Sequence, residues 1–126
     1  MAKKANSTNS INEANLLKNC GVVKALSIIG GRWKPTILFS LLETKQRYNE
    51  LHKSIEGISE RMLVAQLREL EADGLVKRIV YAEVPPKVEY ELTDKGRSAE
   101  TILQELSNWG MYQMHQRGDG LHEKYK

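Results

Sequence analysis

The fold of this 126-residue chain is decided by residues 58–92, ISERMLVAQLRELEADGLVKRIVYAEVPPKVEYEL. Leucines recur at helical spacing from Ser59 to about Asp73, and Gly74 follows, so we expect a helix that ends at the glycine. Two runs of strand-like composition then flank a double proline, which cannot continue a ladder of backbone hydrogen bonds. The prolines therefore belong at the tip of a β-hairpin "wing" over about residues 76–92.

A shorter helix and a turn lie directly upstream of that stretch. Tyr48, Leu51 and Ile55 share one face of a helix, and a turn containing Gly57 separates it from the longer helix. Ser59 is a preferred N-cap residue for the longer helix. Two helices joined by a glycine-containing turn form a helix-turn-helix, expected here over about residues 47–73, and the hairpin makes it a winged one.

The chain as a whole predicts a fold that is mainly α with a small β-hairpin wing. We expect a single winged helix-turn-helix domain over residues 11–116, with N- and C-terminal helices around it. Residues 1–10 are expected to be a flexible lead and residues 117–126 a tail.

Helices are also expected on both sides of this unit. Thr93 can cap a last helix over about residues 94–115. Upstream, one helix is expected to end at Gly30-Gly31 and another to start near Trp33. Their apolar residues are Val22, Val23, Leu26 and Ile29 in the first, and Ile37, Leu38, Leu41 and Leu42 in the second.

Composition narrows the class of protein. With 40% hydrophobic residues the chain can bury a small core, and no apolar run reaches the length of a membrane span. The first ten residues lack the apolar centre of a signal peptide, so we expect a cytoplasmic protein. A single cysteine and three scattered histidines exclude an internal disulfide and a zinc-type cluster, and predict no metal and no cofactor.

The charge is mildly basic, with a net value of +3. Residues 45–90 carry eight basic and eight acidic groups, so nucleic-acid binding requires the basic groups to gather on one face. The longer helix gathers them in this way when Leu63 is placed at the centre of its buried side. The outer face of its first two turns then consists of Arg61, Val64, Ala65 and Arg68.

Such a face suits the major groove of double-stranded DNA. An arginine can form a bidentate contact with guanine, Val64 can touch a thymine methyl group, and the small Ala65 lets the backbone approach closely. An amphipathic helix with arginines outside is also commonly an ordinary solvated face. The adjoining hairpin favours the DNA interpretation, because helix and wing can meet the same duplex.

Other residues are candidates for phosphate contacts. Lys87 follows Pro85 and Pro86 at the wing tip and can project toward phosphate or the minor groove, or it is the surface lysine of an ordinary hairpin. Arg47 and Asn49 can hold a phosphate near the start of the shorter helix, or simply help to cap it. Two weaker candidates are Arg32 and Lys34. The expected DNA-binding set is Arg47, Asn49, Ser59, Arg61, Val64, Ala65, Arg68 and Lys87, with Pro85 and Pro86 at the wing tip.

The ordered motifs of the chain resemble those of the HxlR family of bacterial winged-helix transcription regulators, relatives of the MarR type. The resemblance covers about residues 20–110. Its motifs are Cys20, IIGGRWK (28–34), RYNEL (47–51), GISERML (57–63), QLRELEADGLV (66–76), YAEVPPKVEY (81–90) and LTDKGR (92–97).

The resemblance implies a homodimer that binds a pseudo-palindromic operator and dimerises through its terminal helices, more commonly as a repressor than as an activator. The chain departs from the family pattern at Gly21, where proline is frequent, and at Val64 and Ala65, where polar residues are frequent. Fewer hydrogen-bonding base contacts are then available, so no particular operator sequence is carried over.

The expected dimer interface has some support from the residues themselves. The apolar stripe on the last predicted helix is longer than one small core needs. Gly110 weakens this helix by about 1 kcal/mol relative to alanine and can let a partner helix come close. Helical arms can set the spacing of about 34 Å between recognition helices that read successive major grooves. The expected interface residues are Leu16, Leu17, Ile102, Leu106, Trp109 and Gly110.

Cys20 is a candidate sensor. Some members of the HxlR family use a cysteine at this position to sense oxidants or electrophiles such as quinones. The chemistry needs an accessible thiolate, favoured near a helix start or a cation, and Lys18 and Lys24 are near in sequence. The alternative is a half-buried structural cysteine that does not react.

Two other classes of function remain open. A winged helix can serve as a protein–protein interaction module without specific DNA recognition, in which case binding lacks the steep salt dependence of phosphate contacts. An enzyme is not expected, because the sequence has no paired catalytic carboxylates, glycine-rich phosphate loop or Ser–His arrangement.

Overall fold

The computed structural model describes residues 19–115, which fall into two units that meet between Arg32 and Trp33. The first unit contains α2 (Gly21–Ile29), which ends at Gly30 as expected, and Gly30 N–H donates to the carbonyl of Leu26 at 2.8 Å. The predicted lead (1–10), the tail (117–126) and the dimer candidates Leu16 and Leu17 lie outside the described residues.

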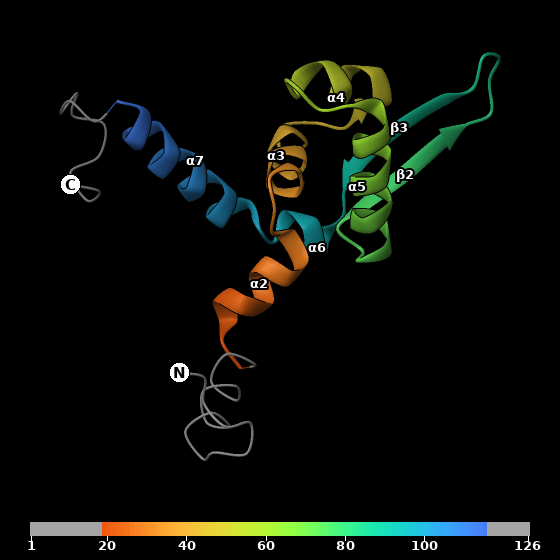
Figure 1. Cartoon of the computed structure of the whole chain (residues 1–126). Helices are drawn as coiled ribbons and strands as arrows, with labels where there is room; N and C mark the ends of the chain where they lie inside the picture. Colours follow the sequence, from red (N-terminus) through yellow and green to blue (C-terminus); the bar gives the residue numbers. More distant parts are fainter. Residues whose placement is uncertain (1–18, 116–126) are drawn as a thin grey trace, which may run out of the picture. The chain divides into compact units, whose positions relative to one another are not determined.

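The second unit builds its core from three helices, α3 (Trp33–Ser40), α4 (Tyr48–Ser54) and α5 (Glu60–Ala72) (Figure 1). Each helix turns its aliphatic residues inward. The apolar residues expected in the second upstream helix are all buried. The largest fully buried side chains of the described chain are Ile37, Leu38, Leu41, Leu51, Leu63, Leu67 and Leu70.

The predicted helix-turn-helix is confirmed in α4, the turn and α5. Gly57 adopts a φ of 88°, a left-handed conformation that favours glycine and reverses the chain between the helices. Ser59 caps α5, and its Oγ accepts the Met62 N–H at 3.0 Å. Ile58 and Leu63 on either side of the cap are both buried, as expected for a hydrophobic staple.

The wing belongs to a three-stranded antiparallel sheet in the order β1-β3-β2. The predicted hairpin consists of β2 (Val76–Tyr81) and β3 (Lys87–Leu92), in a register that runs from Val76 opposite Leu92 to Tyr81 opposite Lys87. The third strand, β1 (Gln46–Arg47), pairs with the middle of β3 and was not predicted. Two residues are too short a run for strand periodicity to be visible.

The hairpin is buried at its base and exposed toward its tip. Val76, Tyr90 and Leu92 are buried. Val80, on the same face of β2 as Val76, is 57% exposed. The reason is that the loop joining β2 to β3 extends away from α5, beyond the helical core (Figure 1).

The last predicted helix is divided into α6 (Asp94–Arg97) and α7 (Glu100–Met114). Thr93 caps α6 as expected, with its Oγ1 accepting the Gly96 N–H at 3.0 Å. Gly96 lies so close to the carbonyl of Leu75 that a Cβ would not fit, and this contact fixes α6 against the sheet. The chain changes direction at Ser98 and Ala99, without a proline or glycine there that could have marked the break.

Candidate nucleic-acid interface

The outward face of α5 carries the predicted recognition residues. Arg61, Ala65 and Arg68 are exposed, and Val64 on the flank is partly buried. Neither arginine has a hydrogen bond or ion pair with another residue in the described range 19–115. Leucines at positions 63, 67 and 70 hold the opposite side of the helix in the core. Two guanidinium groups therefore stand on a rigid, anchored helix with the small Ala65 between them.

A hollow of about 490 Å³ lies between the start of α4 and the wing tip. It brings together residues that are about 40 positions apart in the sequence. Those predicted to contact phosphate, Arg47, Asn49 and Lys87, all line it. The complete lining is Arg47, Tyr48, Asn49, Glu83, Pro85, Pro86, Lys87 and Val88.

The α4 side of this hollow is fixed by main-chain and side-chain contacts. The Arg47 N–H donates to Glu50 Oε1 at 2.9 Å, so Glu50 rather than Asn49 caps the helix. Arg47 and Asn49 are both exposed. Tyr48 donates to the Glu60 carbonyl at 3.3 Å, and its partial burial raises the pKa of its hydroxyl.

On the wing side of the hollow, Lys87 does not project from the tip as expected. The loop residues 82–86 are exposed and contain Glu83 but no cation. The Nζ atom of Lys87 lies 3.6 Å from Glu89 Oε2 and 4.6 Å from the ring centroid of Tyr81. Lys87 is therefore held back on the sheet and does not extend from the tip.

Sequence reasoning missed the group of side chains that holds Lys87. Tyr81 OH donates to Glu89 Oε1 at 2.7 Å, and Lys45 Nζ approaches the same hydroxyl at 3.4 Å and the same carboxylate at 3.8 Å. The hydrogen bond from Tyr81, aided by the two lysines, lowers the pKa of Glu89, and the bond to Tyr81 raises the pKa of Lys45. The strand register that creates this group depends on the loop length, which the sequence pattern leaves open.

Lys34, a weaker DNA-binding candidate, has a different role in the structure. Its Nζ lies 2.7 Å from Glu69 Oε1, and the ion pair ties the start of α3 to the C-terminal part of α5. Its side chain is 13% exposed. Lys34 thus helps to set the position of the recognition helix, and Arg32 is an exposed residue of the first unit.

Comparison with known proteins agrees with the helix-turn-helix geometry of α4 and α5. The profile of the HxlR-like helix-turn-helix family matches residues 28–118. The chain belongs to the HxlR-like helix-turn-helix family. The uncharacterized HTH-type transcriptional regulator YtcD of Bacillus subtilis (strain 168) is 53% identical over 92 residues, 73% of each chain. YdeP of the same organism is 48% identical over 93 residues, 74% of this chain and 73% of YdeP.

Solved structures of HxlR-like and MarR-type regulators share the fold. The redox regulator HypR in its oxidized form is 48% identical with a TM-score of 0.70, over 73% of this chain and 95% of HypR. The reduced form of YodB from B. subtilis is 36% identical with a TM-score of 0.64, over 74% and 92% of the two chains. This HxlR-like chain is accordingly a DNA-binding transcriptional regulator of the winged helix-turn-helix class.

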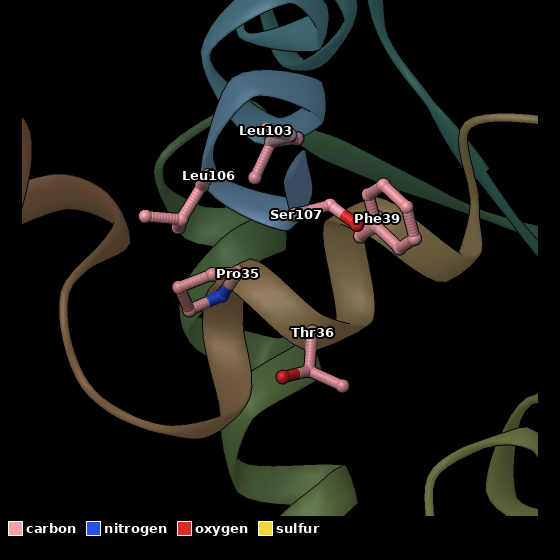
Figure 2. A pocket seen from close by; sticks show the side chains of 6 residues that line it. All are labelled: Pro35, Thr36, Phe39, Leu103, Leu106 and Ser107. Carbon is pink, nitrogen blue, oxygen red and sulfur yellow. The ribbon is translucent and has the colours of Figure 1, made fainter. Parts of the chain in front are cut away.

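The HxlR-like chain also has an apolar surface away from the recognition face. One residue of α7, Leu103, is buried, whereas Ile102, Leu106 and Trp109 are each about half exposed. A pocket of about 240 Å³ opens between α3 and α7, and Figure 2 shows Leu103 and Leu106 of α7 on one side of it. The lining residues are Pro35, Thr36, Phe39, Leu103, Leu106 and Ser107. A Cβ on Gly110 would meet no atom of the described chain within 4 Å.

The remaining candidate of this HxlR-like chain lies in the first unit. Cys20 is the N-cap residue of α2 and is partly buried, and its side chain makes no capping hydrogen bond. Among residues 19–115, no His, Cys, Asp and Glu side chains gather as they would around a metal ion. In the same range every helix falls short of the length and apolar character that a bilayer-spanning segment requires.

Proposed function

We propose that the protein is a homodimeric repressor that binds a pseudo-palindromic operator, with α5 in the major groove and the wing on the neighbouring backbone. The observation that carries this proposal is the exposed, unpaired state of Arg61 and Arg68 on a helix whose other side is anchored in the core. An arginine already engaged by a neighbouring carboxylate would have to exchange that partner for DNA.

Base reading is assigned to the first two turns of α5. Arg61 and Arg68 are seven residues apart, about 10.5 Å along the helix axis, so they reach bases several steps apart. Each can form two parallel hydrogen bonds with guanine O6 and N7, whereas Val64 offers a methyl contact to thymine. Ala65 lies between them, and its small side chain allows the helix to approach the DNA closely.

Backbone contacts are assigned to the hollow between α4 and the wing. The guanidinium of Arg47 and the amide of Asn49 can both donate to phosphate oxygens. The hydroxyl of Ser59 accepts the Met62 N–H and still has its own proton to donate to a phosphate. Lys87 adds charge from the opposite wall of the hollow, and Pro85 and Pro86 shape the tip that meets the minor groove.

Dimerisation is assigned to α7, with a second copy of this chain as its partner. Ile102, Leu106 and Trp109 expose a continuous apolar stripe that its own subunit leaves uncovered in the described chain. The pocket beside Phe39 continues this stripe onto α3 and can receive a side chain of the partner. Gly110 lets the partner helix approach, and residues 16 and 17 are proposed to extend the interface.

Control by oxidants or electrophiles is assigned to Cys20. In the dimer two Cys20 thiols can each lose a proton and an electron to hydrogen peroxide, which forms one disulfide and releases two molecules of water. A quinone would instead add to the thiolate and form a thioether. The partial exposure of Cys20 supports either route, and two structural neighbours are HypR, a redox regulator, and YodB, whose diamide-treated form has been solved.

Selection of bound sequences from random duplexes, with and without peroxide or quinone, tests the proposal. We expect an enriched pseudo-palindrome with half-sites about one helical turn apart, and binding that weakens steeply as salt rises. A Cys20→Ser variant should keep this binding and lose the response to oxidant. Failure to enrich any sequence, together with salt-independent binding to other proteins, would favour an interaction module instead.

A further inference from the structure

The outer face of the wing carries a charged cluster that base reading by α5 does not explain. The cluster consists of Lys45, Tyr81, Lys87 and Glu89. Glu89 is at its centre, because its Oε1 accepts the Tyr81 hydroxyl at 2.7 Å and lies 3.8 Å from Lys45 Nζ, while Oε2 lies 3.6 Å from Lys87 Nζ. One carboxylate thus serves two ammonium groups and one phenol.

The members of the cluster differ in their access to solvent. The side chain of Glu89 is 12% exposed, compared with 44% for Lys45 and 26% for Lys87. The hydrogen bond from Tyr81 lowers the pKa of Glu89, so its carboxylate is ionised at neutral pH. The anion is therefore fixed beneath two cations that approaching phosphates can reach.

The position of the cluster connects it to DNA. Lys87 lines the hollow that also contains Arg47, and Arg47 is directly opposite Glu89 in the register of β1 and β3. A phosphate that enters the hollow must compete with Glu89 for Lys87. The pairing of Lys87 with Tyr81 in the sheet is made by the backbone, so the lysine side chain can change partners without unfolding the wing.

We propose that Glu89 is a positioning residue that restrains Lys45 and Lys87 on the wing and thereby limits how strongly the wing binds the DNA backbone. This inference rests on the proposed function, in which the wing lies along phosphates. With Glu89 present, the cluster presents a net charge of +1, and without it a net charge of +2. Non-specific affinity, which depends on neutralised phosphates, is the quantity that Glu89 should reduce.

The chain offers a matched control on the same strand. Glu91 is two residues along β3, on the same face of the sheet, and pairs with Lys77 at 3.3 Å across the hairpin. A Glu91→Gln change alters the net charge by the same amount. The Glu91 change lies at the base of the wing, and the lysine that it releases, Lys77, does not line the hollow.

The experiment measures the binding of the full chain to a random-sequence duplex as salt is varied. Glu89→Gln should bind about 3- to 10-fold more tightly at low salt, and the slope of log K against log salt should steepen by about one, the value for one added phosphate contact. Tyr81→Phe, which leaves the charge unchanged, should shift affinity in the same direction by a smaller factor. Glu91→Gln should change affinity by less than about 2-fold. Thermal unfolding verifies that each variant is folded.

Several outcomes separate the possibilities. Equal gains for the Glu89 and Glu91 variants would mean that net charge alone acts, and would overturn the inference. An unchanged or weaker affinity of Glu89→Gln would overturn it as well. If replacing Lys45 and Lys87 together with alanine leaves binding unaltered, the wing does not meet phosphates, and that part of the proposed function fails with it. If replacing the two lysines weakens binding but Glu89→Gln does not change it, the proposed function stands and only the inference about Glu89 fails.

Discussion

Replacing Arg61 with alanine is the sharpest test of the recognition face. Arg61 is exposed in the first turn of α5 and has no partner among the described residues, so its loss should change the free energy of unfolding by no more than about 0.5 kcal/mol. A bidentate contact with guanine contributes about 1–3 kcal/mol of discrimination. The variant should therefore bind its selected operator about 5- to 150-fold more weakly.

The assay is a titration of fluorescent operator, in parallel with duplexes in which each candidate guanine pair is replaced. Arg61→Ala should bind the operator and one of the replaced duplexes equally, because the base preference at that position is lost. Arg61→Lys keeps the charge but not the bidentate geometry, and should recover non-specific affinity without that preference. Arg78→Ala, an exposed arginine on β2, is the control for charge. Equal losses for Arg61→Ala on operator and random DNA would refute the assignment.

Three further changes test other parts of the molecule. Ser59→Ala removes the N-cap of α5 and should lower stability by about 1 kcal/mol, seen as a Tm decrease of roughly 4–8 °C; an unchanged Tm would mean that the cap contributes nothing. The pKa of Glu89 is lowered from its ordinary 4.5, so its stabilising contribution is present above pH 4.5 and is lost as the pH falls further. Urea unfolding should accordingly show Glu89→Gln to be less stable than the natural chain at pH 6, by a difference that shrinks as the pH falls below 4.5, whereas a constant difference would contradict the pairing. Leu106→Glu places a charge in the proposed interface and should give monomers in sedimentation. The control Thr101→Glu, on the same helix, should remain dimeric. Dimers in both variants would show that the interface does not include Leu106.

The helix-turn-helix could be predicted because its signals are local. Ser59 is an N-cap in the sequence and in the structure, and the leucine spacing around Leu63 fixed which side of α5 is buried. Local signals of this kind require no knowledge of distant residues.

Features that depend on distant contacts could not be predicted. The two-residue β1 exists because the middle of β3 offers it a partner, and the break before α7 falls at Ser98 and Ala99, where no proline or glycine marks it. Lys87 looked like a free cation because its pairing with Glu89 and Tyr81 depends on the register of the hairpin. Arg47, Asn49 and Lys87, which were predicted from residue type, line one hollow in the structure, whereas the restraint on Lys87 could not be predicted.

Amide chemical shifts of the labelled protein, recorded with and without a selected duplex, test the placement of DNA most directly. The largest changes are expected at residues 59–68 of α5 and in the wing around residues 82–88. Changes confined to α7, with residues 59–68 unaffected at saturating duplex, would contradict a recognition role for the Arg61–Arg68 face.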